Sequence, residues 1–366
     1  MFSRRADWKA PVNRITAARE ARRQRGGEIF DLTISNPTIA GISYPLDELA
    51  GAMSRAARER YDPQPLGLPT AREAVARHLG CDAGDVIITA STSEAYSFLF
   101  KLLTNPGDTI ATAIPSYPLI EHLAAMELIE LRTFPLELHR RWEMTDFEPD
   151  ARTRAICLVS PNNPTGSFVE TAEMERLAKH RLPIIIDEVF RDYPLDGGNP
   201  GAPPAATLAF TLGGLSKSAG LPHYKLGWIR VSGPAEQKRA AIDALEMIAD
   251  NYLSVATPVQ AALPDLLRIG ERIRDSIQDR ITSNLALLRK SLSDDPSIAI
   301  LPAEAGWSAV IRVPATTTDE ETALALLARG VVVQPGYLFD FPGDGYLVIS
   351  LLTPPETLRE GVRRLR

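Results

Sequence analysis

Residues 183–190 read PIIIDEVF, three consecutive isoleucines followed at once by the carboxylate of Asp187. An apolar run without alternation is typical of a strand that other elements cover on both faces. Residues 156–159 (ICLV) have the same character. We therefore expect both runs to be central strands of a parallel sheet, with Asp187 at the carboxyl end of one of them.

Further β-rich runs alternate with helical stretches on either side of this segment. Strands are expected at residues 86–89, 109–113, 155–160, 183–187, 207–212 and 226–231. Such alternation predicts an α/β fold whose mainly parallel sheet carries helices on both faces.

The pattern changes after about Ala256. Apolar residues recur at helical spacing over residues 259–292, where Pro264 and Gly270 are expected to break or bend the helix. Beyond it we expect a smaller α+β domain, with strands at 305–313, 331–334 and 346–351 and helices at 319–329 and 355–365. The predicted organisation is an N-terminal segment (1–45) that joins the small domain, a large ligand-binding domain (46–255), a connecting helical region (256–290) and a small C-terminal domain (291–366).

The composition excludes several classes of protein. The 366 residues are 45% hydrophobic and 23% charged, which is ordinary for a folded soluble chain. A formal net charge of -6 offers no general attraction for nucleic acid or an anionic membrane. Two cysteines, Cys81 and Cys157, are too few for a disulfide framework. Charges in the first nine residues occupy the place where a secretory signal needs apolar residues, so we expect a cytoplasmic protein.

Ligands of an open parallel sheet bind beyond the carboxyl ends of its strands, so the loops after the apolar runs are the candidate sites. The first loop reads TASTSEA (89–95), in which Ser91, Thr92 and Ser93 open a helix that runs to about Leu103. Hydroxyls and free backbone N–H groups at a helix N-terminus suit an anion such as phosphate. Simple helix capping is the alternative.

The second and third loops hold polar side chains at strand ends. PNNPTG (161–166) carries Asn163 between prolines that restrict the backbone, so the loop can aim an amide at a ligand; an ordinary Asn-Pro turn is the alternative. Asp187 needs a cationic partner, because a buried unpaired charge is costly. It can equally cap a following helix.

The fourth loop (212–228) places Lys217 in the Gly- and Ser-rich turn GGLSKSAG. Apolar neighbours can lower the pKa of a lysine and favour attack of its amine on a carbonyl. Most lysines are instead solvated surface groups.

Taken together and in this order, the four segments resemble the class I/II aminotransferases, the fold-type I enzymes that use pyridoxal 5′-phosphate (PLP). The resemblance extends from about Asp31 to the C-terminus. It implies a large PLP-binding domain with a mainly parallel sheet, a smaller α+β domain, and a homodimer with active sites at the interface.

The resemblance also implies roles for single residues around the cofactor ring. Lys217 would form the Schiff base with PLP and then shuttle a proton, and Asp187 would pair with the protonated pyridine nitrogen. Asn163 would donate to the phenolic oxygen. Tyr117, in PSYP (115–118), would stack on the ring, although an aromatic at the core edge is the structural alternative.

Further matches lie around the phosphate and the substrate. Ser91, Thr92 and Ser93 would hold the phosphate together with Ser216 and Lys225. Tyr61 resembles the tyrosine that reaches the phosphate of the neighbouring subunit, which is the basis for the expected homodimer. Asn36 falls in the N-terminal loop that contacts substrate, with an Asx turn before Pro37 as the alternative.

Three departures from the family pattern bear on the substrate. Phe190 stands where a tyrosine usually donates to the PLP phenolic oxygen, and Lys225 replaces an arginine with its planar fork. Val348 stands where an arginine usually binds the substrate carboxylate. His223 and Arg191 are hypothetical replacements, with Arg312 as a weaker third, although each such residue more often has a surface or packing role.

The function expected from these matches is a PLP-dependent aminotransferase. It would move an amino group between a small-molecule amino donor and an oxo acid, ketone or aldehyde in a ping-pong cycle, without nucleic-acid or membrane partners. A PLP-dependent lyase or decarboxylase is the alternative, since a fold does not select among these reactions. A non-catalytic protein that binds PLP or a metabolite is a third.

Overall fold

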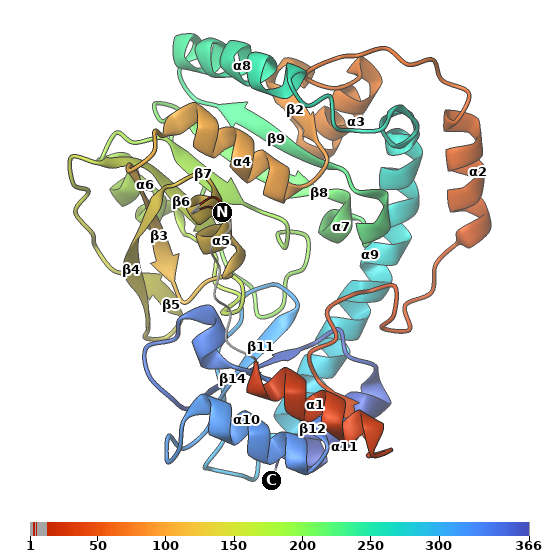
Figure 1. The fold of residues 1–366 in the computed structure, drawn as a ribbon, viewed down its shortest axis with the longest axis vertical. Coiled ribbons are helices and arrows are strands. Elements are labelled where there is room, and N and C mark those ends of the chain that lie inside the picture. The colour runs from red at the N-terminus through yellow and green to blue at the C-terminus, as the bar shows by residue number, and fades with distance from the viewer. Residues whose placement is uncertain (1–2, 4, 6–12, 366) are drawn as a thin grey trace.

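The computed structural model describes residues 3, 5 and 13–365, so most of the charged N-terminal stretch discussed above lies outside the described residues. The chain forms a large part around an eight-stranded sheet and a small part around a four-stranded sheet (Figure 1). A long helix, α9 (Thr257–Leu292), runs from one part to the other. No helix among the described residues is both long and apolar enough to span a bilayer.

The large sheet confirms the predicted α/β class. Its strand order is β2 (Val86–Thr89), β9 (Gly227–Ser232), β8 (Ala209–Gly214), β7 (Ile184–Asp187), β6 (Thr153–Val159), β3 (Thr109–Ile114), β4 (Glu130–Leu138) and β5 (Trp142–Met144). Pairing is parallel from β8 through to β4, whereas β9 runs antiparallel to both of its neighbours and β5 runs antiparallel to β4.

Strands β4 and β5 are absent from the strands expected above. Exposed residues interrupt the buried positions of β4, and Pro135 lies within it. The strand therefore lacks the continuous apolar run that marks β6 and β7. Its pairing with β3 on one side and β5 on the other holds it in the sheet.

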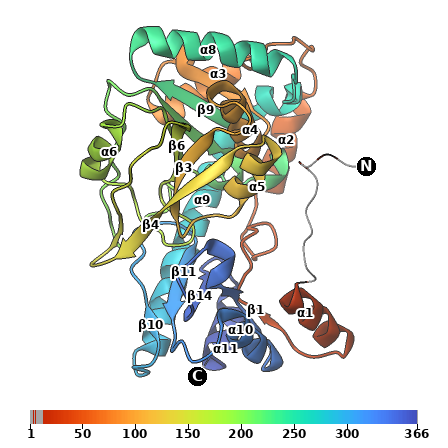
Figure 2. The same cartoon turned by 60° about the vertical axis from the view of Figure 1, so that its left-hand side comes forward.

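Helices cover both faces of the sheet, as the apolar runs predicted. Ile185 packs on one face with α4 (Thr92–Leu103), α5 (Leu119–Met126) and α8 (Ala235–Asp250). Ile184 and Ile186 point to the other face, toward α6 (Thr171–Ala178) and residues of the small part. Figure 2 shows α4 and α8 on one side of the strands. Helices α2 (Leu46–Ala56) and α3 (Pro69–Leu79) pack against α9.

Pro264 and Gly270, which are expected to break or bend the helix, do not break it: α9 is one continuous helix with Pro264 inside it. Gly270 instead permits a close approach: a Cβ there would lie 2.4 Å from the Cβ of Ala219. Ala219 follows α7 (Leu215–Ser218), the short helix that contains Lys217. Glycine at this position therefore lets α9 press against the lysine turn.

The small part contains β10 (Ala299–Ile300), β11 (Ser308–Arg312), β14 (Tyr346–Ser350) and β13 (Gln334–Pro335) in that order. Helix α10 (Asp319–Ala328) packs against β13 and β14, and α11 (Pro355–Arg363) packs against α9 and β1 (Phe30–Asp31). The single strand expected at 331–334 is wrong. Residues there divide between β12 (Val331–Val332), which pairs with β1, and β13, which pairs with β14. Helix α1 (Arg14–Gln24) packs on α10.

Candidate active site

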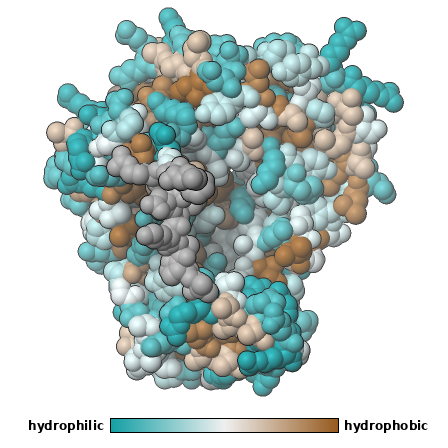
Figure 3. All heavy atoms as spheres, in the orientation of Figure 1, coloured by the Kyte–Doolittle hydropathy of each residue, from teal (hydrophilic) through white to brown (hydrophobic). Residues whose placement is uncertain are grey.

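A cavity of about 290 Å³ lies where the carboxyl ends of β6, β7 and β8 approach the N-terminus of α4 and the small sheet. The space-filling view shows the surface hollowed between the large and small parts (Figure 3). Nine of the sequence-predicted residues line the cavity together: Ser91, Thr92, Ser93, Tyr117, Asn163, Asp187, Ser216, Lys217 and Lys225.

Strand register explains why these loops meet. Asp187 lies directly beside Val159 on β6 and Leu212 on β8. The ladder continues past the strand ends, since the Ser160 N–H donates to the Asp187 carbonyl and the Glu188 N–H donates to the Leu212 carbonyl. The asparagine loop, the aspartate and the lysine turn therefore share one edge of the sheet.

Lys217 lies half-buried among aromatic rings. Its Nζ is 4.6 Å from the centroid of the Trp307 ring and 5.5 Å from that of Phe190. Burial lowers the pKa of Lys217 to about 8, against the opposing effect of Asp187. The backbone of the turn is also held, because the Tyr193 hydroxyl donates to the Lys217 carbonyl. The site therefore presents an amine that loses its proton more readily than a surface lysine does.

Asp187 is 7% exposed and accepts two hydrogen bonds. The Val189 N–H donates to Oδ1 at 3.1 Å and the Tyr96 hydroxyl donates to Oδ2 at 3.0 Å. A turn follows β7, so Asp187 does not cap a helix. Burial raises the pKa of Asp187 to about 6, although both hydrogen bonds and the nearby Lys217 act to lower it. A cation placed beside this carboxylate would relieve the cost of burying its charge.

The N-terminus of α4 forms the opposite end of the cavity. Ser91 caps this helix, since its Oγ accepts from the Glu94 N–H at 3.2 Å, and the capping alternative is therefore real for this residue. Thr92, Ser93 and Ser216 add hydroxyls to the lining, and Lys225 adds a cation. Lys225 has a φ of 48°, a left-handed conformation that costs energy for a residue with a side chain.

The two asparagines of the PNNPTG loop have different roles. The Asn162 side chain turns back into the loop and accepts hydrogen bonds from the Thr165 N–H and hydroxyl. Asn163 lines the cavity. Tyr117 also lines it and is 44% exposed.

Comparison with known proteins decides the family of this chain. Residues 28–365 match the profile of the family described as Aminotransferase class I and II. The chain belongs to that family. The predicted membership of the class I/II aminotransferases is thereby confirmed, and the enzymes of this family use PLP.

Individual relatives agree with this assignment. The chain is 29% identical over 255 residues to nicotianamine aminotransferase 1 of Oryza sativa subsp. japonica, covering 63% of this chain and 51% of the rice protein. It therefore spans about half the length of that relative. Human tyrosine aminotransferase is 24% identical and is covered to 84% by an alignment that spans 97% of this chain. The alanine aminotransferase of Pyrococcus furiosus has the same fold, with a TM-score of 0.89 at 23% identity over 100% of this chain and 98% of that one.

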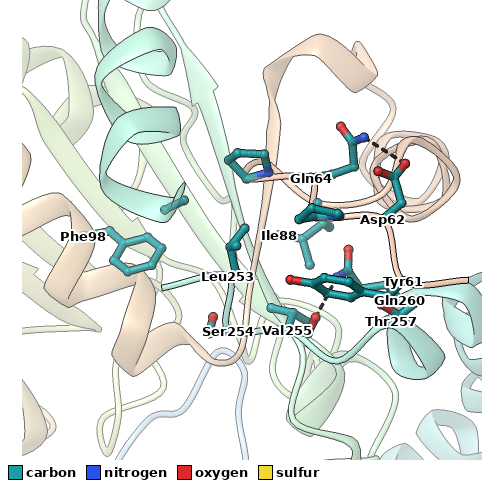
Figure 4. Close-up of a pocket in the computed structure, with 14 residues that line it drawn as sticks. Tyr61, Asp62, Gln64, Ile88, Phe98, Leu253, Ser254, Val255, Thr257 and Gln260 are labelled. Carbon is teal, nitrogen blue, oxygen red and sulfur yellow. Dashed lines mark hydrogen bonds between the residues drawn. The ribbon is translucent and has the colours of Figure 1, made fainter. Parts of the chain in front are cut away.

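Five of the side chains proposed from the resemblance do not line the cavity, namely Tyr61, Asn36, His223, Arg191 and Arg312. Tyr61 is 72% exposed and belongs to a separate pocket with Asp62, Gln64 and Gln260 (Figure 4). The other four form local contacts described next.

Asn36 and His223, both proposed on the substrate side, have local partners. Asn36 Oδ1 accepts from the Thr38 N–H and hydroxyl, which is the Asx turn given above as its alternative. His223 is exposed and packs beside Tyr44 and Tyr224.

Two arginines also have partners outside the cavity. Arg191 forms an ion pair with Glu188, with 2.6 Å between Nη1 and Oε1. Arg312 lies 5.1 Å from the centroid of the Tyr346 ring. Within residues 3, 5 and 13–365, the cavity lining contains no arginine, and Val348 is fully buried in an apolar cluster with Val310 and Phe339.

Sequence reasoning missed several residues of the site. Tyr96 lies one helical turn after Thr92 on α4, so helical spacing alone would have placed it on the same face. Trp307, Ser308, Gln334 and Ser350 come from the small part, and no local signal in the sequence connects them to the strand ends of the large sheet.

Proposed function

We propose that this cavity holds PLP and that the chain uses it to move an amino group from an amino donor to an oxo acid, ketone or aldehyde in a ping-pong cycle. One observation carries the proposal. A lysine of lowered pKa, a buried carboxylate and a hydroxyl-rich helix N-terminus line the same cavity. These three features are complementary to the aldehyde, the pyridine nitrogen and the phosphate of PLP.

Each end of the cavity has a role toward the cofactor. Ser91, Thr92, Ser93, Ser216 and Lys225 would bind the phosphate. Charged oxygens are favoured at a helix N-terminus by its free N–H groups and its dipole, and the Lys225 charge adds to this attraction.

The ring contacts come from the strand ends and the loop after β3. Asp187 would hold the protonated ring nitrogen, Asn163 would donate to the phenolic oxygen, and Tyr117 would stack on the ring. Phe190 lies in the lining where a tyrosine would add a second donor to that oxygen. When bound, PLP supplies an aldehyde that reacts with amines and a ring that accepts the electron pair released at the substrate carbon.

Lys217 would carry out the proton transfers. With a pKa of about 8, about one Lys217 side chain in ten is neutral at pH 7, which gives Nζ the free electron pair that a nucleophile or base requires. Trp307 and Phe190 enclose Nζ with apolar surface and limit the access of water. The neutral Nζ would take a proton from the substrate carbon and return it to the cofactor.

The remaining assignments concern the assembly and its surroundings. We propose a homodimer in which Tyr61 reaches the phosphate of the neighbouring subunit, because its exposed side chain has no place in the cavity of its own subunit. Asn36, His223 and Arg191 remain candidates for substrate contact. The proposed location is the cytoplasm, and pairing of β1 with β12 supports the proposed assignment of the N-terminal segment to the small domain.

The test is cofactor attachment followed by a donor panel. Wild-type protein incubated with PLP and reduced with borohydride should carry the cofactor on Lys217, as peptide mass spectrometry reports. Lys217→Ala should carry none, and Lys179→Ala, which removes an exposed lysine outside the cavity, should label like the wild type. Attachment elsewhere, or no uptake of PLP, would refute the proposal.

The donor panel separates the possible reactions. An aminotransferase converts bound PLP to its amine form and releases the matching oxo compound. Release of ammonia would indicate a lyase, and release of carbon dioxide a decarboxylase. Bound PLP that responds to no amino donor would indicate a binding protein.

A further inference from the structure

A buried tyrosine and a buried cysteine stand behind the carboxylate of Asp187. Tyr96 on α4 is 2% exposed, and Cys157 on β6 is fully buried. The Tyr96 hydroxyl donates to Asp187 Oδ2 and also interacts with the Cys157 thiol. Three elements of the large part thus bring three ionisable side chains into one contact.

The hydrogen bonds determine which way the carboxylate faces. Each oxygen of Asp187 already has one donor, Val189 N–H on Oδ1 and Tyr96 O–H on Oδ2. A carboxylate has about four acceptor positions, so positions remain for a cation on the cavity side. A donor that bonds to the charged form stabilises that form, and it also restricts rotation of the group.

The tyrosine is suited to act only as a donor toward Asp187. Burial and the neighbouring carboxylate raise the pKa of Tyr96, so its hydroxyl keeps its proton. Burial also raises the pKa of the Cys157 thiol, which keeps its proton as well. The Cys157 thiol lies beside the same hydroxyl on the side away from the cavity lining.

We propose that Tyr96 is a positioning residue for the cofactor: it holds the charged carboxylate of Asp187 toward the pyridine nitrogen of PLP, and Cys157 orients the Tyr96 hydroxyl. The inference rests on the proposed function, in which Asp187 meets that nitrogen. The charge of Asp187 acts on five ionisable groups of the surrounding elements, namely Tyr96, Tyr117, Cys157, Glu188 and Lys217, and of these Tyr96 and Lys217 lower the pKa of Asp187 itself. Tyr96 is the only side chain among them that donates a hydrogen bond to the carboxylate within residues 3, 5 and 13–365.

The experiment removes the Tyr96 hydroxyl and, separately, replaces the pyridine nitrogen of the cofactor, which Asp187 would contact. Tyr96→Phe is titrated with PLP and with 1-deaza-PLP, which has carbon in place of the pyridine nitrogen but keeps the aldehyde, the phenol and the phosphate. We expect Tyr96→Phe to bind PLP about tenfold more weakly than wild type, the size of one hydrogen bond to a charged group. Binding of 1-deaza-PLP should stay within about twofold, because this ligand offers Asp187 no cation.

The pH dependence provides a second readout that a packing defect would not change. Without the Tyr96 donor the pKa of Asp187 should rise further, so that PLP affinity is lost at a higher pH as the solution is acidified. Cys157→Ala keeps Tyr96 but removes the group that orients it, and should cause a smaller loss for PLP alone. If Tyr96→Phe does not fold, Cys157→Ala decides by the same comparison.

Two further variants separate the possible failures. Tyr44→Phe removes a half-buried tyrosine hydroxyl outside the cavity lining, which donates to the Gly220 carbonyl, and should bind both ligands like wild type. Asp187→Asn should lose the preference for PLP over 1-deaza-PLP altogether. If Asp187→Asn keeps that preference, the proposed contact with the nitrogen fails. The role of Tyr96 is overturned by either of two results. In the first, Asp187→Asn loses the preference for PLP over 1-deaza-PLP while Tyr96→Phe keeps it in full. In the second, Tyr96→Phe weakens the binding of both ligands equally.

Discussion

Replacing Asp187 by asparagine should stabilise the PLP-free protein and at the same time weaken PLP binding. Burial raises the pKa of Asp187 from an ordinary 3.8 to about 6. The folded protein therefore holds this proton more tightly than the unfolded chain does. Each unit of pKa corresponds to about 1.4 kcal/mol, so the charged side chain costs the folded state about 3 kcal/mol at pH 7.

The size of this stabilisation by Asp187→Asn depends on pH in a way that can be measured. Below about pH 4 the carboxyl group is protonated in both the folded and the unfolded state, so it costs the folded state nothing. Between about pH 4 and 6 the group ionises in the unfolded chain before it does so in the folded protein, so the wild-type free energy of unfolding decreases as the pH rises. Above about pH 6 the full cost is present. Asparagine is neutral at every pH and similar in shape, so the advantage of Asp187→Asn should grow from near zero at pH 4 to about 3 kcal/mol at pH 7.

Urea unfolding of PLP-free wild-type and Asp187→Asn protein from pH 4 to pH 8 tests this reasoning. Asp146→Asn is the control, because its carboxylate side chain is 86% exposed and the stability difference should stay flat across the range. A stability difference for Asp187→Asn that does not change with pH, or a less stable variant at pH 7, would refute the argument. PLP affinity should fall about tenfold to a hundredfold in the same variant, because a charged contact is lost.

Three more predictions concern the other groups of the proposed PLP site. Lys225→Ala should bind PLP about tenfold more weakly than wild type and with less dependence on salt, whereas Lys225→Arg should keep the wild-type affinity and salt dependence. Equilibrium dialysis at two salt concentrations checks this, and an unchanged salt dependence in Lys225→Ala would contradict it. Phe190→Tyr adds a donor to the cavity lining, so the pH titration of the visible absorption of bound PLP should move to lower pH, and a titration identical to wild type would count against this placement of the ring. Tyr61→Phe should weaken PLP binding without altering stability, since Tyr61 is 72% exposed. In hybrid dimers with Lys217→Ala subunits, the Tyr61→Phe subunit should regain wild-type affinity, and no recovery would mean that Tyr61 serves its own subunit.

Much of the large sheet could be predicted because its signals are local. The continuous apolar runs of β6 and β7 predict strands that are covered on both faces, and Asp187 directly follows the isoleucines of β7. Since parallel strands present their carboxyl ends at one edge, Asn163, Asp187 and Lys217 could be expected near one another before any contact was known. The outlying strands β4 and β5 could not, because exposed positions break the apolar pattern of β4 and β5 is only three residues long.

Helix α9 and residues 331–335 show where longer-range packing prevails. Pro264 and Gly270 carry the local signal of a helix break, yet the helix continues and Gly270 serves as a contact point for Ala219. The apolar run at 331–334 has the pattern of one strand, but its residues pair with β1 and β14 in different sheets. In both places distant partners determine the outcome.

The sequence by itself determined which residues stand at the strand ends, because strand formation, turn chemistry and helix capping depend on neighbours in the chain. Only the tertiary structure decided the environment of those residues. Trp307 reaches Lys217 from the small part, and Tyr96 reaches Asp187 from α4. The lowered pKa of Lys217 and the raised pKa of Asp187 follow from that enclosure, since desolvation depends on every segment that excludes water and no single stretch of chain encodes it.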